Sequence, residues 1–238
     1  MAEPQNPPRK TVERSFHRYS TSFPGGLQRP IDHVELGPDL PTNLDRRLLG
    51  DLSGKRVLEL GAGMAHGSVA MAKQGAKVIA VDPDIGQLDH ARELCDAEEV
   101  VVELKHSDLA DLAFLRENSF DAVVSVFAMA AAPDLDRVFR QVHRILRPEG
   151  PFVFSLPHPA ATLVDALAEN PNEIVQSYFD TEPLGSGPTL TYPHPITDVF
   201  TGLIRANFRV DTLLEPTPST DGVNVPQTLV VRGKKVGS

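Results

Sequence analysis

A short apolar run that leads into paired glycines constrains the fold of this chain more than any other feature. Residues 56–67 read Arg-Val-Leu-Glu-Leu-Gly-Ala-Gly-Met-Ala-His-Gly, which is typical of a buried strand, a glycine turn and the first turn of a helix. Because Gly61 and Gly63 carry no side chains, backbone N–H groups of the turn can come close to a ligand. The segment predicts an α/β protein that binds a nucleotide-like cofactor.

Apolar strands and amphipathic helices alternate after this turn. The pattern predicts strands at residues 57–60, 78–81, 100–104, 122–126 and 152–156, and helices at 64–74, after Asp84 and after Asp134. The helix after Asp84 has an apolar stripe of Ile85, Leu88, Ala91 and either Leu94 or Cys95. A helix at 196–204 and a hairpin of strands 210–214 and 228–231 complete the chain. Such alternation predicts a doubly wound, mostly parallel sheet with helices on both faces.

The domain organisation follows from where this alternation begins and stops. Residues 1–50 are irregular and rich in proline, so we expect a tail followed by a lid segment. The main domain then occupies residues 51–238. Within it, residues 157–195 show no clear period, and a connection of that length predicts an inserted binding segment.

Composition excludes several classes of protein. The 238 residues carry a formal net charge of −9, with a pI near 5.3, which disfavours nucleic acid as a partner. Cys95 is the only cysteine, which favours a reducing compartment. The polar N-terminus lacks the apolar core of a signal peptide, and the apolar stretch 122–132 is too short to span a membrane. These features predict a soluble cytoplasmic protein, and they leave the oligomeric state open.

Two acids follow predicted strands at positions where a nucleotide could be held. Asp82 lies about 20 residues after Gly61, where an acid in nucleotide-binding folds accepts hydrogen bonds from ribose hydroxyls. Helix capping is the alternative role, but Asp84 already occupies the cap position. Asp108 and Leu109 follow the next strand and could hold an adenine ring. All these residues are expected to meet with the glycine turn in one crevice.

The order of these motifs resembles the class I S-adenosylmethionine-dependent methyltransferases, and residues 54–156 carry the resemblance. The motifs are Val57-Leu-Glu-Leu-Gly-Ala-Gly, Val81-Asp82, Ser107-Asp108-Leu109, Ser119-Phe-Asp-Ala-Val-Val-Ser125 and Leu146-Arg-Pro-Glu-Gly150. Weaker similarity continues through Tyr192-Pro-His-Pro, Ala206-Asn-Phe-Arg-Val and Leu214-Glu-Pro. The resemblance implies a seven-stranded Rossmann-like sheet whose last strand is antiparallel, and S-adenosyl-L-methionine as cofactor.

The resemblance also assigns cofactor contacts to particular residues. Glu59 and the turn Gly61-Ala62-Gly63 would frame the methionine end, and Asp82 would hold the ribose. The remaining contacts would come from Pro83, Asp108 and Leu109 beside the adenine and from Ser125 and Val126 near the sulfonium. Ala65 departs from the family pattern, which often has a third glycine there, and His66 follows where its imidazole could reach the methionine carboxylate.

The implied reaction is direct displacement of the activated methyl group onto an acceptor. The protein then has to align the acceptor and exclude water. A hydroxyl or protonated amine acceptor would need a base, for which His158 is the first candidate and His194 the second. Each histidine could instead be held only by loop hydrogen bonds. Tyr19 and Tyr178 are candidate substrate contacts, although either could simply pack.

Three questions stay open in the sequence. The acceptor is expected to be a small molecule, but no residue identifies the methylated atom, and the histidines show no metal-ligand spacing. Gly61, Gly63 and Gly67 also fit one dinucleotide fingerprint, so an NAD(P)-dependent oxidoreductase is an alternative. A non-catalytic protein that binds S-adenosylmethionine is another, because binding motifs do not prove catalysis.

Overall fold

A computed structural model of the chain describes residues 29–164, 170, 172–185, 190–219 and 222–237. These residues form one seven-stranded sheet of order β3-β2-β1-β4-β5-β7-β6. Its strands are β1 (Arg56–Leu60), β2 (Lys77–Asp82), β3 (Val102–His106), β4 (Ala122–Val126), β5 (Pro151–Pro157), β6 (Phe208–Leu214) and β7 (Thr228–Lys235). β7 is antiparallel to both of its neighbours, and the pairs from β3 to β5 are parallel. The expected fold class is confirmed.

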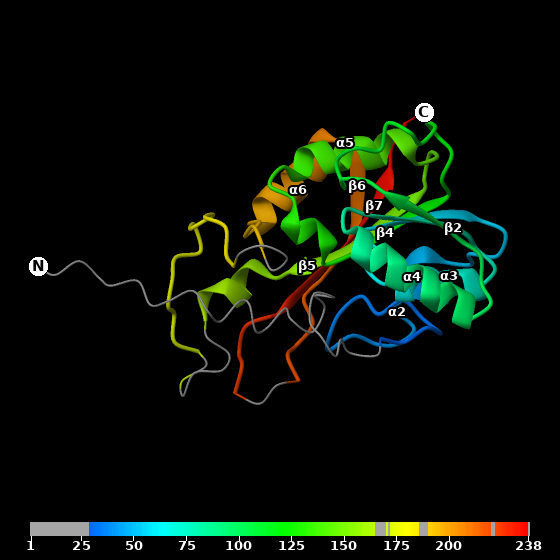
Figure 1. The fold of residues 1–238 in the computed structure, drawn as a ribbon. Coiled ribbons are helices and arrows are strands. Elements are labelled where there is room, and N and C mark those ends of the chain that lie inside the picture. Colours follow the sequence, from blue (N-terminus) through cyan, green and yellow to red (C-terminus); the bar gives the residue numbers. More distant parts are fainter. Residues whose placement is uncertain (1–28, 165–169, 171, 186–189, 220–221, 238) are drawn as a thin grey trace, which may run out of the picture.

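Helices cover both faces of the sheet (Figure 1). The α-helices are α2 (Leu44–Leu49), α3 (His66–Lys73), α4 (Ile85–Ala97), α5 (Leu135–Ile145) and α6 (Ile196–Arg205), and the 3₁₀ helices are η1 (Ala128–Ala131) and η2 (Pro159–Leu163). Figure 1 shows α5 and α6 on one face and α2, α3 and α4 on the other. Each face therefore buries its own hydrophobic core.

Alternation along β5 shows how the sequence supplies both cores. Phe152 and Phe154 point to the α5 face, where Phe139 packs edge-on against Phe152 with the ring centroids 6.1 Å apart. Val153 points to the opposite face and joins the second core. Because successive side chains of a strand alternate in direction, this fully buried strand reads as a continuous apolar run.

The first described segment contributes to the second core. Val34 and Leu36 are buried with Leu44, Leu48 and Leu49 of the α2 region. They pack on the face of the sheet that also buries residues of β4, β5 and β7. The described part of the expected tail and lid therefore has apolar side chains anchored on the sheet.

Several predicted element boundaries were wrong by a few residues. The third strand begins at Val102, because the chain closes α4 with Glu99 at φ +54° and the Val100 N–H bonding back to Cys95. Val101 is consequently 90 % exposed. The first predicted helix begins at His66 rather than at residue 64, because Ala65 is left-handed.

Two predicted helix faces also needed correction. In α4, Leu88, Ala91 and Cys95 are buried, but Ile85 is 63 % exposed because it lies at the open N-terminal end. In α6, the apolar positions of the sequence also include Phe200 and Ile204, but these two are about half exposed, since the buried stripe runs through Val199 and Leu203. The predicted cap of α4 is confirmed, because Asp84 Oδ1 accepts the N–H groups of Gly86 and Gln87.

Candidate active site

The glycine turn joins β1 to α3 at the carboxyl edge of the sheet. Gly61 has φ +75° and Gly63 has φ +54°, conformations that favour glycine. The Gly61 N–H donates to the Val81 carbonyl at 2.8 Å, which fixes the turn to the end of β2. A methyl group at Gly61 would lie 2.0 Å from Ala128 Cβ, so this position accepts no larger residue. The turn therefore packs closely against the start of η1, and only glycine fits at position 61.

The departure from three glycines at Ala65 has a local explanation. Ala65 has φ +63° and is fully buried immediately before α3. Alanine can hold this left-handed conformation at a modest cost that glycine avoids, roughly 1 kcal/mol. His66 then begins the helix, and burial together with the Arg29 charge lowers its pKa below the ordinary value. The helix N-terminus thus forms without a third glycine.

Glu59 is a buried acid directly beneath that helix N-terminus. Its Oε2 accepts a hydrogen bond of 2.5 Å from Ser68 Oγ, and the residue is 3 % exposed. Burial is the main cause that raises the pKa of Glu59 to about 7, while Ser68 and the Arg29 charge act in the opposite direction. A methyl group at Gly67 would lie 2.3 Å from Glu59 Oε1. Gly67 therefore makes room for this carboxyl group.

Asp82 ends β2 and joins the glycine turn to the start of α4. One carboxylate oxygen accepts the Gly63 N–H at 2.7 Å and the other accepts the Asp84 N–H at 2.9 Å. The residue is 7 % exposed, and burial raises the pKa of its carboxyl group above the ordinary value. Each oxygen retains a lone pair for a ligand hydroxyl. Asp82 thus lies where the sequence placed the ribose contact.

The residues expected around the adenine border the same turn. Leu109 is buried, and its Cδ2 lies 3.6 Å from the space where a Gly61 side chain would be. Asp108 is exposed, and its Oδ1 accepts the Ala110 N–H at 2.7 Å. Pro83 is exposed too, and its carbonyl lies 2.9 Å from His106 Nε2. The structure brings these segments together at one edge.

Ser125 and Val126 lie at the end of β4, as predicted. The Ser125 hydroxyl is fully buried and donates to the Leu60 carbonyl at 2.7 Å. This bond ties β4 to β1 just before the glycine turn. Val126 is 7 % exposed and contributes to the second core. Ser125 therefore holds the end of β1 in place, and its hydroxyl proton is engaged in that bond.

Both ring nitrogens of His158 have partners. Nδ1 accepts the Ala160 N–H at 3.0 Å, which leaves Nε2 as the protonated nitrogen. Nε2 lies 2.7 Å from Glu215 Oε1 and donates to that carboxylate. His158 is 4 % exposed, and burial lowers its pKa although Glu215 acts in the opposite direction. The imidazole has no free lone pair for a proton from an acceptor.

His194 differs from His158 in this respect. It lies in the segment before α6, which joins η1 through the Tyr192 N–H and the Ala130 carbonyl at 2.8 Å. Burial lowers the pKa of His194, while hydrogen bonds to the backbone of Ala132 and Met129 partly offset the shift. Its Nε2 is buried without a hydrogen-bond partner in the part of the chain that the structure describes. Nε2 of His194 is thus unbonded among the described residues, whereas both ring nitrogens of His158 have partners.

The structure describes only one of the two candidate tyrosines. Tyr178 is half-buried, and its hydroxyl accepts the N–H of Ile196 at 3.3 Å at the start of α6. The ring therefore supports the helix that follows His194. Tyr19 lies outside the described residues. The sequence motifs did not single out Arg29 or Glu215, although the Leu214-Glu-Pro motif contains Glu215.

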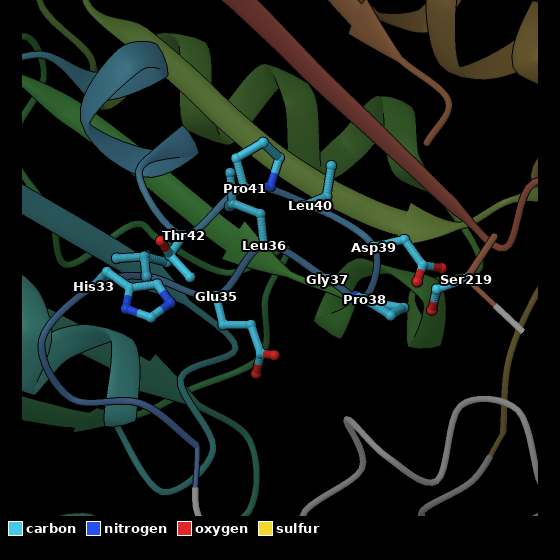
Figure 2. A pocket seen from close by; sticks show the side chains of 11 residues that line it. His33, Glu35, Leu36, Gly37, Pro38, Asp39, Leu40, Pro41, Thr42 and Ser219 are labelled. Carbon is cyan, nitrogen blue, oxygen red and sulfur yellow. The ribbon is translucent and has the colours of Figure 1, made fainter. Parts of the chain in front are cut away.

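A separate pocket of about 310 Å³ lies in the N-terminal segment (Figure 2). Residues 33–42 and Ser219 line it, and none of the predicted site residues does. Gly37 in its wall lies against Thr228 of β7 and Phe127. Glu35 and Asp39 are the acidic residues of this pocket, and Glu35 Oε2 lies 3.7 Å from Arg29 Nε. This pocket is distinct from the crevice at the glycine turn.

The described residues contain no cluster of three His, Cys, Asp or Glu side chains that could hold a metal ion. Within the same residues, none of the helices combines the length and apolar character needed to cross a bilayer.

Comparison with known proteins agrees with the architecture. Residues 57–150 match the family model described as a methyltransferase domain. The sequence is 31 % identical over 163 residues to a demethylmenaquinone methyltransferase of Clavibacter sepedonicus, covering 59 % of this chain and 66 % of the relative. It is 34 % identical over 135 residues to a ubiquinone biosynthesis O-methyltransferase of Xanthomonas oryzae pv. oryzae, covering 55 % and 53 %. The chain thus spans between half and two thirds of these curated relatives.

Solved structures show the same fold. An S-adenosylmethionine-dependent methyltransferase from Mesorhizobium loti matches with a TM-score of 0.68 at 24 % identity, over 80 % of this chain and 95 % of that one. A 1,6-didemethyltoxoflavin-N1-methyltransferase from Burkholderia thailandensis, with S-adenosylhomocysteine bound, matches with a TM-score of 0.58 at 19 % identity, over 78 % and 72 %. At these identities the likeness concerns the fold.

Proposed function

We propose that this chain, which belongs to the class I S-adenosylmethionine-dependent methyltransferases, transfers a methyl group to a small-molecule acceptor. S-adenosylmethionine is the cofactor of this family, and it supplies an electrophilic methyl group already bonded to a sulfonium. The observation that carries the proposal is the joint geometry of Asp82 and the glycine turn. The Asp82 carboxylate accepts the Gly63 and Asp84 N–H groups, and its two oxygens keep further lone pairs for the hydroxyl groups of a ligand.

The residues of the crevice fit such a cofactor. Gly61 and Gly63 supply the positive-φ turn that exposes backbone N–H groups to a ligand, and Asp82 offers oxygens to the ribose hydroxyls. In this proposal Glu59 is the acid for the methionine amino group, and the Arg29 charge, which acts on Glu59, serves the methionine carboxylate. The remaining contacts in the proposal are Ala62, Pro83, Asp108, Leu109, Ser125 and Val126. Each group binds or orients the cofactor, and none reacts with it.

His194 is the better candidate for the base. Proton removal from a hydroxyl or an ammonium acceptor needs a lone pair, and Nε2 of His194 is unbonded among the described residues, whereas both nitrogens of His158 are occupied. The lowered pKa of His194 keeps the ring neutral at pH 7. Because Nε2 is buried, the segment before α6 has to move for an acceptor to reach it. We therefore assign the base to His194 and a positioning role to His158.

A small-molecule acceptor agrees with the charge and with the relatives. The net charge of −9 opposes binding to a phosphate backbone. The two curated relatives named above have names that refer to demethylmenaquinone and ubiquinone biosynthesis. An NAD(P)-dependent oxidoreductase is disfavoured by the antiparallel β7 between β5 and β6, since dinucleotide folds typically continue with parallel strands.

Ligand binding separates the proposed function from its alternatives. Calorimetry should show saturable binding of S-adenosylhomocysteine and no binding of NAD⁺ or NADP⁺. Incubation with tritiated S-adenosylmethionine and a low-molecular-weight metabolite extract should then label the small-molecule fraction. Stabilisation by a dinucleotide alone would refute the proposal, and binding without any methyl transfer would favour a non-catalytic binding protein.

The base assignment has its own test once an acceptor is labelled. His194→Gln should lower turnover by about a hundredfold without changing the affinity for S-adenosylhomocysteine. The acid limb of the wild-type pH–rate profile should lie below the ordinary histidine value of 6.5, and it should disappear in the variant. An unchanged profile would remove His194 as the base.

A further inference from the structure

We propose that Glu215, held in place by His158, binds a protonated amine of the methyl acceptor. This inference rests on the proposed function, because it concerns the acceptor side of the same crevice. It begins with the His158–Glu215 pair, which joins the loop after β5 to the end of β6 at 2.7 Å. The two residues are separated by 57 positions in the chain, so only the fold brings them together.

The hydrogen bonds of His158 fix its charge. Because Nδ1 accepts a backbone N–H, it cannot also carry a proton, and the ring is neutral with its proton on Nε2. That proton is donated to Glu215 Oε1. The pair therefore carries a net charge of −1, and all of this charge belongs to the Glu215 carboxylate. His158 orients the carboxylate without neutralising it.

The carboxylate has no counter-charge among the described residues. Its side chain is 45 % exposed, and the neutral His158 is the only described residue with a side-chain nitrogen within ion-pair distance of it. Asp211, four residues earlier in β6, is by contrast paired with Arg232 at 2.6 Å. A carboxylate that is held rigidly and half-exposed favours a positively charged donor, since charge-assisted hydrogen bonds are the stronger ones.

Topology places the pair at the acceptor side. Since β7 is antiparallel to both β5 and β6, the carboxyl ends of β5 and β6 lie at the same edge as those of β1 and β4. Val126 pairs with Ser155, so His158 lies three residues further along the chain, roughly 10 Å beyond the end of β4 at the usual rise per residue. The pair is therefore placed to contact a remote group of the acceptor, away from the methylated atom.

A structural clamp is the competing explanation of the pair. The bond joins two loops across β7, and such a bond could serve only to fix them. A clamp needs the His158 ring to be buried and partnered, which it is. A clamp would also gain from the charged partner, because charge-assisted hydrogen bonds are the stronger ones, so the geometry of the pair does not separate the two explanations. An experiment has to detect binding of a cation at Glu215 directly.

The test is a titration of the protein saturated with S-adenosylhomocysteine. Benzylammonium chloride is the probe, sodium benzoate is the anionic control, and the side-chain ¹⁵N signals of His158 are the readout. The signals are assigned by their loss in His158→Gln. We expect benzylammonium to shift the Nε2 signal saturably and benzoate to have no such effect. The Nδ1 signal should report the neutral tautomer throughout.

Matched variants complete the experiment. Glu215→Gln should weaken benzylammonium binding at least tenfold. Glu173→Gln, which changes an exposed glutamate within residues 157–195, should leave the binding unchanged. No saturable shift, an equal shift with benzoate, or unaltered binding in Glu215→Gln would overturn the proposal and leave a clamp. If the wild type fails to bind S-adenosylhomocysteine, the proposed function itself is wrong, so the two failures are distinguishable.

Discussion

The carboxyl group of Glu59 occupies the space that a side chain at residue 67 would fill. A methyl group on Gly67 would lie 2.3 Å from Glu59 Oε1, well inside any acceptable contact. Ser68, the next residue of α3, donates to the other oxygen of the same carboxyl group. The first turn of α3 is therefore built over a buried acid, and the glycine at position 67 serves that acid rather than a phosphate.

Gly67→Ala should destabilise the protein by about 2 kcal/mol, because the new methyl group forces Glu59 or the helix to move. Gly86→Ala is the control, since a methyl group there lies 3.2 Å from the Asp84 side chain in the first turn of α4. Denaturant unfolding of both variants gives the comparison. Equal stability of the two variants would contradict the steric explanation.

Glu59 should make the stability of the ligand-free protein depend on pH. Its pKa is raised from 4.5 to about 7 on folding, so its contribution is fully present below pH 4.5 and is lost as the pH rises through about 7. The loss is on the order of 3 kcal/mol for a shift of this size. Unfolding free energies measured from pH 4.5 to 8 should fall in the wild type and stay flatter in Glu59→Gln. Parallel curves would show that another group is responsible.

Asp82→Asn should weaken S-adenosylhomocysteine binding by about ten- to a hundredfold, because the ribose hydroxyls and the Gly63 N–H lose a charged acceptor. Asp89→Asn is the matched control, since Asp89 lies exposed on α4 in an ion pair with Arg92. Calorimetry at one pH measures both affinities. If Asp82→Asn binds as tightly as the control, the ribose assignment is wrong.

Two buried threonines should respond oppositely to the same substitution. Thr228 Oγ1 has no hydrogen-bond partner in the described part of the chain, so Thr228→Val should stabilise the protein by about 1 kcal/mol. Thr162 Oγ1 donates to the Pro159 carbonyl at 2.8 Å, and Thr162→Val should cost about 1 kcal/mol. Thermal unfolding measures both changes. A loss of stability in Thr228→Val would reveal a partner for its hydroxyl.

Much of the fold was predictable because its signals are local. The glycine turn, the Asp84 cap and the alternation of apolar segments each involve residues within one helical turn or one strand. Asn207 after α6 is of a residue type that tolerates the left-handed conformation, and it has φ +64°. The errors occurred at exposed helix positions such as Ile85 and at boundaries, as at Val102, where the closing turn of α4 extends two residues further than the apolar pattern indicates.

The candidate site shows the same difference between features that depend on local sequence and features that depend on distant contacts. The sequence alone predicted that the glycine turn, Asp82, Asp108 and Ser125 lie at one edge of the sheet, since strand ends of a parallel sheet meet at one edge and their spacing is fixed by short loops. The partners of the two candidate histidines depend instead on the tertiary structure. His158 and Glu215 meet across β7, and His194 Nε2 is buried without a partner among the described residues. A proton's position depends on such distant partners, which leave no trace in local sequence.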